Sequence, residues 1–230
     1  MNVYTWIFVG LMAVDLILYI VALVKRITPM EKTARGLFVP LTAGIVLSIL
    51  TDYLPDSHHI IFIASMAFGA ATLFMISTLK DKNRFFKFAE HFFFLLTEAF
   101  WFMLIVSVYR IFKIPDLFFV LAGIVFIAGF VVICVFIKKQ SVFKYAAAII
   151  QYIFAAVLCT TALISLVYEK RAFGIVMFCG TLITICHVIF EIFQRTRPFA
   201  ISEKTERIIV TIFSVCTQAL LGAGAILMQV

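Results

Sequence analysis

The stretch YTWIFVGLMAVDLILYIVALV, residues 4–24, decides the class of this protein. Asp15 is its one charged side chain, and its length matches the ~20 residues that a helix needs to cross a bilayer. Lys25 and Arg26 follow it directly, where a secretory signal would have small residues for cleavage. We therefore predict that this segment is a retained membrane-spanning helix.

Seven further segments of this kind fill the rest of the chain. Apolar residues make up 64% of the sequence and charged residues 13%, a balance that cannot give a soluble domain a polar surface. Strands are disfavoured because a lone strand leaves its backbone unsatisfied in lipid, and the alternation of a barrel is absent. We predict an all-α polytopic membrane protein, a bundle of eight transmembrane helices in one integral membrane domain over 1–230, with spans 4–24, 36–54, 59–79, 88–109, 114–137, 145–168, 172–193 and 208–230.

The basic residues are distributed unevenly between the two sides of this bundle. Fifteen lie in the connections after the first, third, fifth and seventh segments: Lys25, Arg26, Lys32, Arg35, Lys80, Lys82, Arg84, Lys87, Lys138, Lys139, Lys144, Arg195, Arg197, Lys204 and Arg207. Four lie on the opposite side: Arg110, Lys113, Lys170 and Arg171. The positive-inside rule makes the first side cytoplasmic, with both termini non-cytoplasmic, in a multi-pass protein of the cell or inner membrane. The net charge of +7 then indicates contact with anionic lipid headgroups, not with nucleic acid.

Few polar side chains lie within the spans, and each is a candidate site residue because burying it in lipid is costly. By position they fall between mid-membrane and the cytoplasmic surface, with Arg35 at the cytoplasmic mouth of the second span. We expect them to line a polar cavity that opens to the cytoplasm. The set is Asp15, Arg35, Glu98, His187, Glu191 and Gln218, with Glu90 and His91 nearer the cytoplasmic end of the fourth span and Gln151 in the cytoplasmic part of the sixth.

His187 and Glu191 are four residues apart and share one helix face. One interpretation is an acid/base or metal site, and a zinc-dependent hydrolase would use these two residues with Glu98 and His91. The other is hydrogen bonding between helices. We expect no metal or cofactor in the first instance, and zinc is the alternative.

Several short patterns resemble the YhhN-like membrane family, the lysoplasmalogenases, over almost the whole chain. The family has a Lys-Pro and a Leu/Pro-rich start to its second helix, and Arg35–Leu41, RGLFVPL, is similar. Its third helix has a Gly-Asp and a Leu-rich stretch. Phe68–Met75, FGAATLFM, is similar, with Thr72 in place of the aspartate.

The later helices continue the resemblance. Glu98 and Trp101 stand where the family has a His and, three residues on, a Tyr. In Gly180–His187, GTLITICH, His187 replaces the family's second aspartate. Ser214–Gly222, SVCTQALLG, keeps the glutamine, Gln218, and the apolar tail.

The resemblance implies an eight-helix protein that hydrolyses the vinyl ether bond of a lysolipid. Glu98 would be the general acid, His187 the base for water, and Glu191 the group that holds His187 in one tautomer. Arg35 would bind the lipid phosphate and Gln218 a glycerol hydroxyl, with Asp15, Thr72 and Trp101 as further substrate contacts. Because both family aspartates are replaced, a non-enzymatic lipid-binding or transport protein on the same scaffold is the alternative. The expected partner is a membrane lysophospholipid, and the sequence leaves the oligomeric state open.

Overall fold

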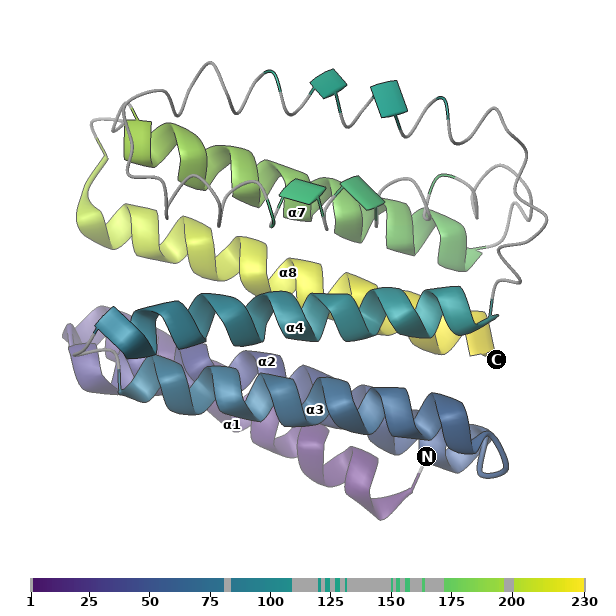
Figure 1. The fold of residues 1–230 in the computed structure, drawn as a ribbon. Helices are drawn as coiled ribbons and strands as arrows, with labels where there is room; N and C mark the ends of the chain where they lie inside the picture. The colour runs from purple at the N-terminus through teal and green to yellow at the C-terminus, as the bar shows by residue number, and fades with distance from the viewer. Residues whose placement is uncertain are drawn as a thin grey trace. The chain divides into compact units, whose positions relative to one another are not determined.

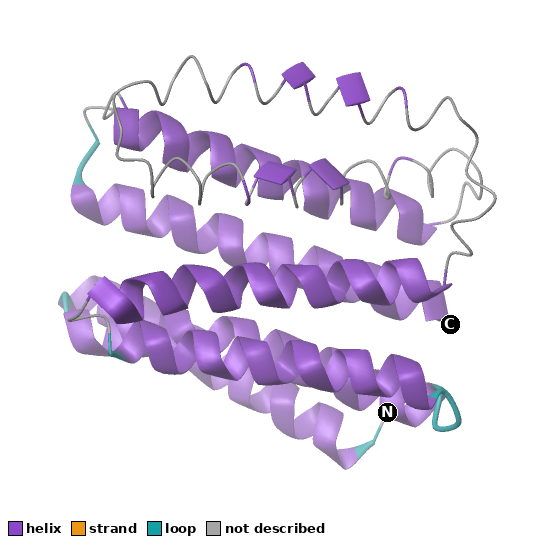
Figure 2. Ribbon diagram, in the orientation of Figure 1, coloured by secondary structure: helices purple, strands orange, loops and turns teal. Residues whose placement is uncertain are grey.

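A computed structural model gives the fold (Figure 1), and it describes residues 2–80, 84–108, 172–196 and 201–229, with a few isolated residues between 120 and 163. These residues form six helices and no strands (Figure 2), so the all-helical class is confirmed for them. The helices are α1 (Val3–Lys25), α2 (Thr28–Tyr53), α3 (His58–Leu79), α4 (Arg84–Val108), α7 (Ala172–Thr196) and α8 (Glu203–Gln229).

Four stretches of the described residues are long and apolar enough to cross a membrane: Val3–Lys25, Thr28–Tyr53, His58–Leu79 and Thr205–Gly224. A shorter apolar stretch, Ile175–His187, lies in α7. Several apolar helices of this length fit a multi-pass integral membrane protein. The predicted spans 114–137 and 145–168 fall almost wholly outside the described residues, so the count of eight helices stays a prediction.

Except for α3, the observed helices are longer than the predicted spans at the ends expected to face the cytoplasm. The clearest case is α2, which we predicted to begin at Gly36 and which begins two turns earlier, at Thr28, with Pro29 in its first turn. Proline is favoured there because the amide hydrogen it lacks has no partner inside the helix. The predicted boundary was wrong because hydropathy marks the edge of the hydrocarbon, whereas polar side chains such as Glu31 and Lys32 can extend a helix beyond it.

The chain divides into two compact units, Met1–Tyr109 with Ala225–Val230, and Arg110–Gly224. In the first unit, α2 packs against α1 and α3, and α3 packs against α4 (Figure 1). As a result α2 is buried on nearly every side, whereas α1 buries little beyond Thr5, Asp15, Tyr19 and Ala22. The second unit contains α7 and the part of α8 up to Gly224.

Small residues allow close packing in both units. In α3, Ala64, Ala67 and Ala71 are fully buried and recur at helical spacing on one face. In the second unit, a Cβ at Gly180 would lie 3.0 Å from Cβ of Leu220, so α7 and α8 approach closely there. Close contacts of this kind hold the helices together by van der Waals packing, because lipid provides no hydrophobic driving force between apolar surfaces.

Both connections at one end of the first unit carry basic residues. Lys25 and Arg26 end α1, and Arg26 adopts a left-handed conformation with φ of 56° that turns the chain into α2. Lys80 ends α3 at the same end, because successive helices alternate in direction (Figure 1). The opposite connection, between α2 and α3, contains Asp56 and no Lys or Arg. The uneven distribution of basic residues along the sequence therefore places them at one end of the folded first unit and leaves the other end without them.

Candidate functional site

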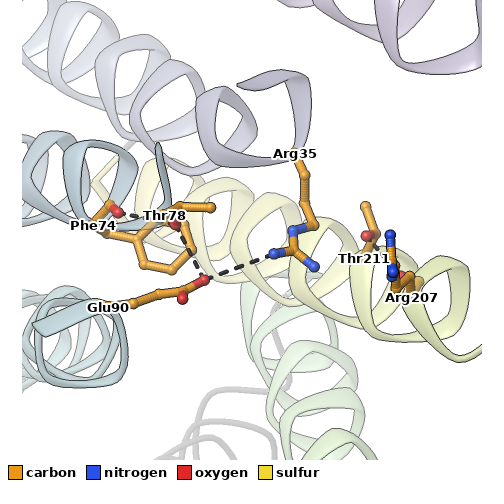
Figure 3. Close-up of polar contacts among 6 residues, drawn as sticks. All are labelled: Arg35, Phe74, Thr78, Glu90, Arg207 and Thr211. Atoms are coloured by element: carbon orange, nitrogen blue, oxygen red, sulfur yellow. Dashed lines mark hydrogen bonds and ion pairs between the residues drawn. The ribbon is translucent and has the colours of Figure 1, made fainter. Parts of the chain in front are cut away.

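At the basic end of the first unit, three helices bring together a polar cluster (Figure 3). A guanidinium nitrogen of Arg35 in α2 lies 3.8 Å from Oε1 of Glu90 in α4. The hydroxyl of Thr78 in α3 donates to the same Glu90 oxygen at 3.2 Å, and lies 3.0 Å from the backbone carbonyl of Phe74 as a second acceptor. Thr78 is buried, while a quarter of the Arg35 side chain is exposed.

The helix pairing explains why these residues meet. The rings of Phe74 and Phe94 lie 5.5 Å apart, one turn from the contact between Thr78 and Glu90, so α3 and α4 run antiparallel with a fixed register. The early start of α2 places Arg35 in the second turn of this helix. Thr78 was not predicted from the sequence, and Glu90 was placed near the cytoplasmic end of its span but given no role, because spacing along one segment cannot indicate a contact among three helices.

The cluster leaves Arg35 available for an anion. Its contact with Glu90 is long, and both side chains are partly exposed, at 25% and 19%. Ion pairs in such settings contribute about 0–1 kcal/mol to stability. A phosphate therefore competes for Arg35 against a weak partner, and the guanidinium fork suits phosphate oxygens.

Glu98 and Trp101 lie deeper along α4, and both are buried. Glu98 is one turn beyond Phe94, whose ring contacts α3, so it shares roughly that face of α4. In the register of α3 and α4 it is level with Ala70, a small buried residue.

Asp15 and Thr72 were predicted as substrate contacts, and the structure gives them different surroundings. Asp15 in α1 is 3% exposed, and within the described part of the chain neither of its carboxyl oxygens has a hydrogen-bond partner. The hydroxyl of Thr72 is within hydrogen-bonding distance of the backbone carbonyl of Phe68 in its own helix, at 2.9 Å. The hydroxyl of Thr72 is thus satisfied locally, whereas the carboxyl of Asp15 is not.

In the second unit, His187 of α7 is buried, and its ring stacks on Phe213 of α8 at 5.7 Å between centroids. One turn away, the hydroxyl oxygens of Thr184 and Thr217 lie 3.4 Å apart. Gln218 follows Thr217 and is 1% exposed. The structure thus brings His187 and Gln218 to the same stretch of the α7–α8 pair.

The remaining predictions about the site have mixed outcomes. Glu191 belongs to α7, but its side chain lies outside the described residues, as does that of His91. Glu98 belongs to the first unit and His187 and Gln218 to the second, so their convergence on one cavity stays a prediction. Among the side chains that the structure describes, no three His, Cys, Asp or Glu residues form a group able to hold a metal ion.

Comparison of the sequence with protein-family models, curated proteins and solved structures finds no match. The resemblance to the YhhN-like family therefore depends on the quoted residues alone. Functional assignment then has to come from the chemistry of the described residues, chiefly the Arg35 cluster, the buried carboxyl groups and the α7–α8 pair.

Proposed function

We propose that this protein is a multi-pass membrane protein that hydrolyses the vinyl ether bond of a lysolipid, a lysoplasmalogenase of the YhhN-like kind. The observation that carries the proposal is the arrangement along α4. Glu90, beside Arg35, lies at the basic end, and Glu98 is buried two turns deeper, about 12 Å along the helix. A lipid whose phosphate binds Arg35 would extend its first chain carbons in the direction of Glu98.

The reaction requires an acid strong enough to protonate carbon. Glu98 donates a proton to the alkenyl carbon, which leaves an oxocarbenium-like cation on the ether carbon. Water then adds to this carbon and loses a proton, and the hemiacetal collapses to a fatty aldehyde and a glycerophosphodiester that carries the freed hydroxyl. His187 is proposed as the base for the water proton, with Glu191, one turn on in α7, orienting its ring. Gln218 is proposed to bind a glycerol hydroxyl.

Aldehyde release tests the proposal directly. Purified protein in lipid nanodiscs is given a lysoplasmalogen or, as control, the matching lysolipid with a saturated alkyl ether. We expect aldehyde only from the vinyl ether, because only an alkenyl carbon can accept the proton. Binding of both lipids without aldehyde, across a broad pH range and with or without zinc, would exclude hydrolysis.

That result would instead support the second candidate, a lipid-binding or transport protein. The observation that favours it is the replacement of both family aspartates, by Thr72 and His187. The hydroxyl of Thr72 lies within hydrogen-bonding distance of its own helix backbone, which leaves it poorly suited to acid/base work. The Arg35 cluster serves a binder equally well, since it recognises a phosphate without requiring chemistry at the chain.

Substitution of Arg35 is expected to weaken substrate binding and to leave the chemical step unchanged. A headgroup contact stabilises the bound substrate and the transition state alike, so R35A should raise KM with little change in kcat. R35K keeps the charge but loses the planar fork, and should fall between R35A and the wild type. Lys32, also near the start of α2, provides the matched control as K32A. A fall in kcat at constant KM in R35A would contradict a headgroup role.

The proposed orientation places the basic end of the first unit in the cytoplasm and both termini outside. Single cysteines introduced at Lys82 and at Ser57, in a variant without the native cysteines, should react with impermeant reagents from opposite sides. We expect Lys82→Cys to react only from the cytoplasmic side and Ser57→Cys only from outside. The reverse pattern would invert the topology and place the Arg35 cluster at the outer surface.

A further inference from the structure

The carboxylate of Glu90 is held in place by α3 as well as by Arg35 (Figure 3). The hydroxyl of Thr78 lies 3.2 Å from Oε1 of Glu90, and Thr78 itself is 1% exposed. A Cβ at Gly36, the residue after Arg35, would lie 3.6 Å from Cβ of Thr78, so α2 packs closely on α3 at this level. The contact with Thr78 therefore keeps the Glu90 carboxylate beside Arg35 when the guanidinium binds another anion.

The second oxygen of this carboxylate is open to a ligand. Thr78 and Arg35 both contact Oε1, and within the described residues Oε2 has neither a hydrogen bond nor an ion pair. The Glu90 side chain is 19% exposed, so a group at the surface can reach it. Arg35 and Glu90 also lie at the edges of the predicted spans 36–54 and 88–109, where lipid headgroups are expected. A cation and an anion are thus available side by side to one headgroup.

Such a pair discriminates between headgroups by their charge. A headgroup whose phosphate is followed by an ammonium group, such as phosphoethanolamine, can place the phosphate at Arg35 and the ammonium at Glu90. A headgroup without a cation, such as phosphoglycerol, brings the same phosphate to Arg35 but sets it beside the like charge of Glu90, which is unfavourable. Arg35 alone would not separate these two lipids.

We propose that Glu90 is a specificity-determining residue that selects lipids with a zwitterionic headgroup, and that Thr78 positions its carboxylate. This selection rests on the proposed function, in which Arg35 binds the lipid phosphate. It is the same for a hydrolase and for a lipid-binding protein, because Glu90 has no part in cleavage of the chain.

Binding of two lysolipids measures the selection. They share one saturated alkyl ether chain, which is not cleaved, and differ only in an ethanolamine or a glycerol headgroup. The protein is kept in an uncharged detergent, so that no bilayer headgroup competes. The measured quantity is the ratio of dissociation constants, glycerol lipid over ethanolamine lipid, and it should exceed one in the wild type. E90Q should lower this ratio about fivefold, the effect of one partly exposed charge contact.

Three further variants serve as controls for E90Q. E31Q removes the same charge one turn before Arg35, and within the described residues Glu31 makes no ion pair with it, so the wild-type ratio should remain. E31Q thereby accounts for any effect of net charge alone. T78V removes the hydroxyl that positions Glu90 and should lower the ratio, whereas T78S keeps the hydroxyl and should preserve it.

R35A distinguishes failure of this selection from failure of the proposed function, and it should weaken binding of both lipids. If R35A does so while E90Q keeps the wild-type ratio, Glu90 does not select the headgroup, although the phosphate site stands. Tighter binding of both lipids by E90Q at an unchanged ratio would mean that Glu90 only competes for Arg35, and would also overturn the selection, as would a wild-type ratio of one or less. If R35A leaves both affinities unchanged, the phosphate site and the selection fail together.

Discussion

Glu98→Gln should lower the turnover of a lysoplasmalogen by about 10²–10⁴-fold, the range over which general acids typically act. Glutamine preserves the size of this fully buried side chain and can still form hydrogen bonds, but it has no carboxylic proton to give to carbon. Lipid binding should stay close to that of the wild type. His187→Ala should also abolish turnover if His187 is the base for water. Aldehyde release under saturating lipid measures both effects.

The matched control for Glu98 is Glu31→Gln, in the first turn of α2, where no part of the reaction is assigned. It should retain wild-type turnover. If Glu98→Gln retained full turnover in a folded protein, Glu98 could not be the acid. Loss of folding in Glu98→Gln is separated from loss of chemistry by measuring lipid binding and the thermal midpoint on the same preparation.

Trp101→Ala should reduce the stability of the protein by about 3–5 kcal/mol, the usual effect of deleting a large aromatic side chain from a packed interior. Trp101 is 1% exposed and is the largest fully buried side chain of the described residues. Its removal leaves a cavity whose walls lose their van der Waals contacts. Thermal unfolding in detergent or nanodiscs, followed by circular dichroism, measures the loss.

Trp6, the second tryptophan of the sequence, is the natural control because it is 63% exposed in α1. Trp6→Ala should change the stability little, since this side chain has few neighbours to lose. A stability of Trp101→Ala equal to that of the wild type, with weakened lipid binding, would favour the substrate contact that the resemblance implies. A large loss of stability would identify Trp101 as a packing residue.

The sequence by itself determined the helical class and the location of several helices. The apolar stretch 4–24 became α1 at Val3–Lys25, and 59–79 became α3 at His58–Leu79, because length and hydropathy are local properties. It also determined which connections are basic, and alternation of helix direction placed Lys25 and Lys80 at one end of the first unit. The start of α2 was misplaced because apolar residues report where lipid begins, not where backbone hydrogen bonding begins.

Only the tertiary structure decided which faces of these helices meet. α1 and α2 look alike as apolar segments, yet α1 is largely exposed, whereas α2 is mostly buried between Ala34 and Leu50. Sequence cannot separate them, because a side chain that faces lipid and one that faces another helix are both apolar. The contacts of Arg35 could not be predicted from the sequence either. Glu90 meets Arg35, and Thr78 meets Glu90, through the rotation and register of three separate helices. Within the described residues Asp15 has no hydrogen-bond partner, for the same reason.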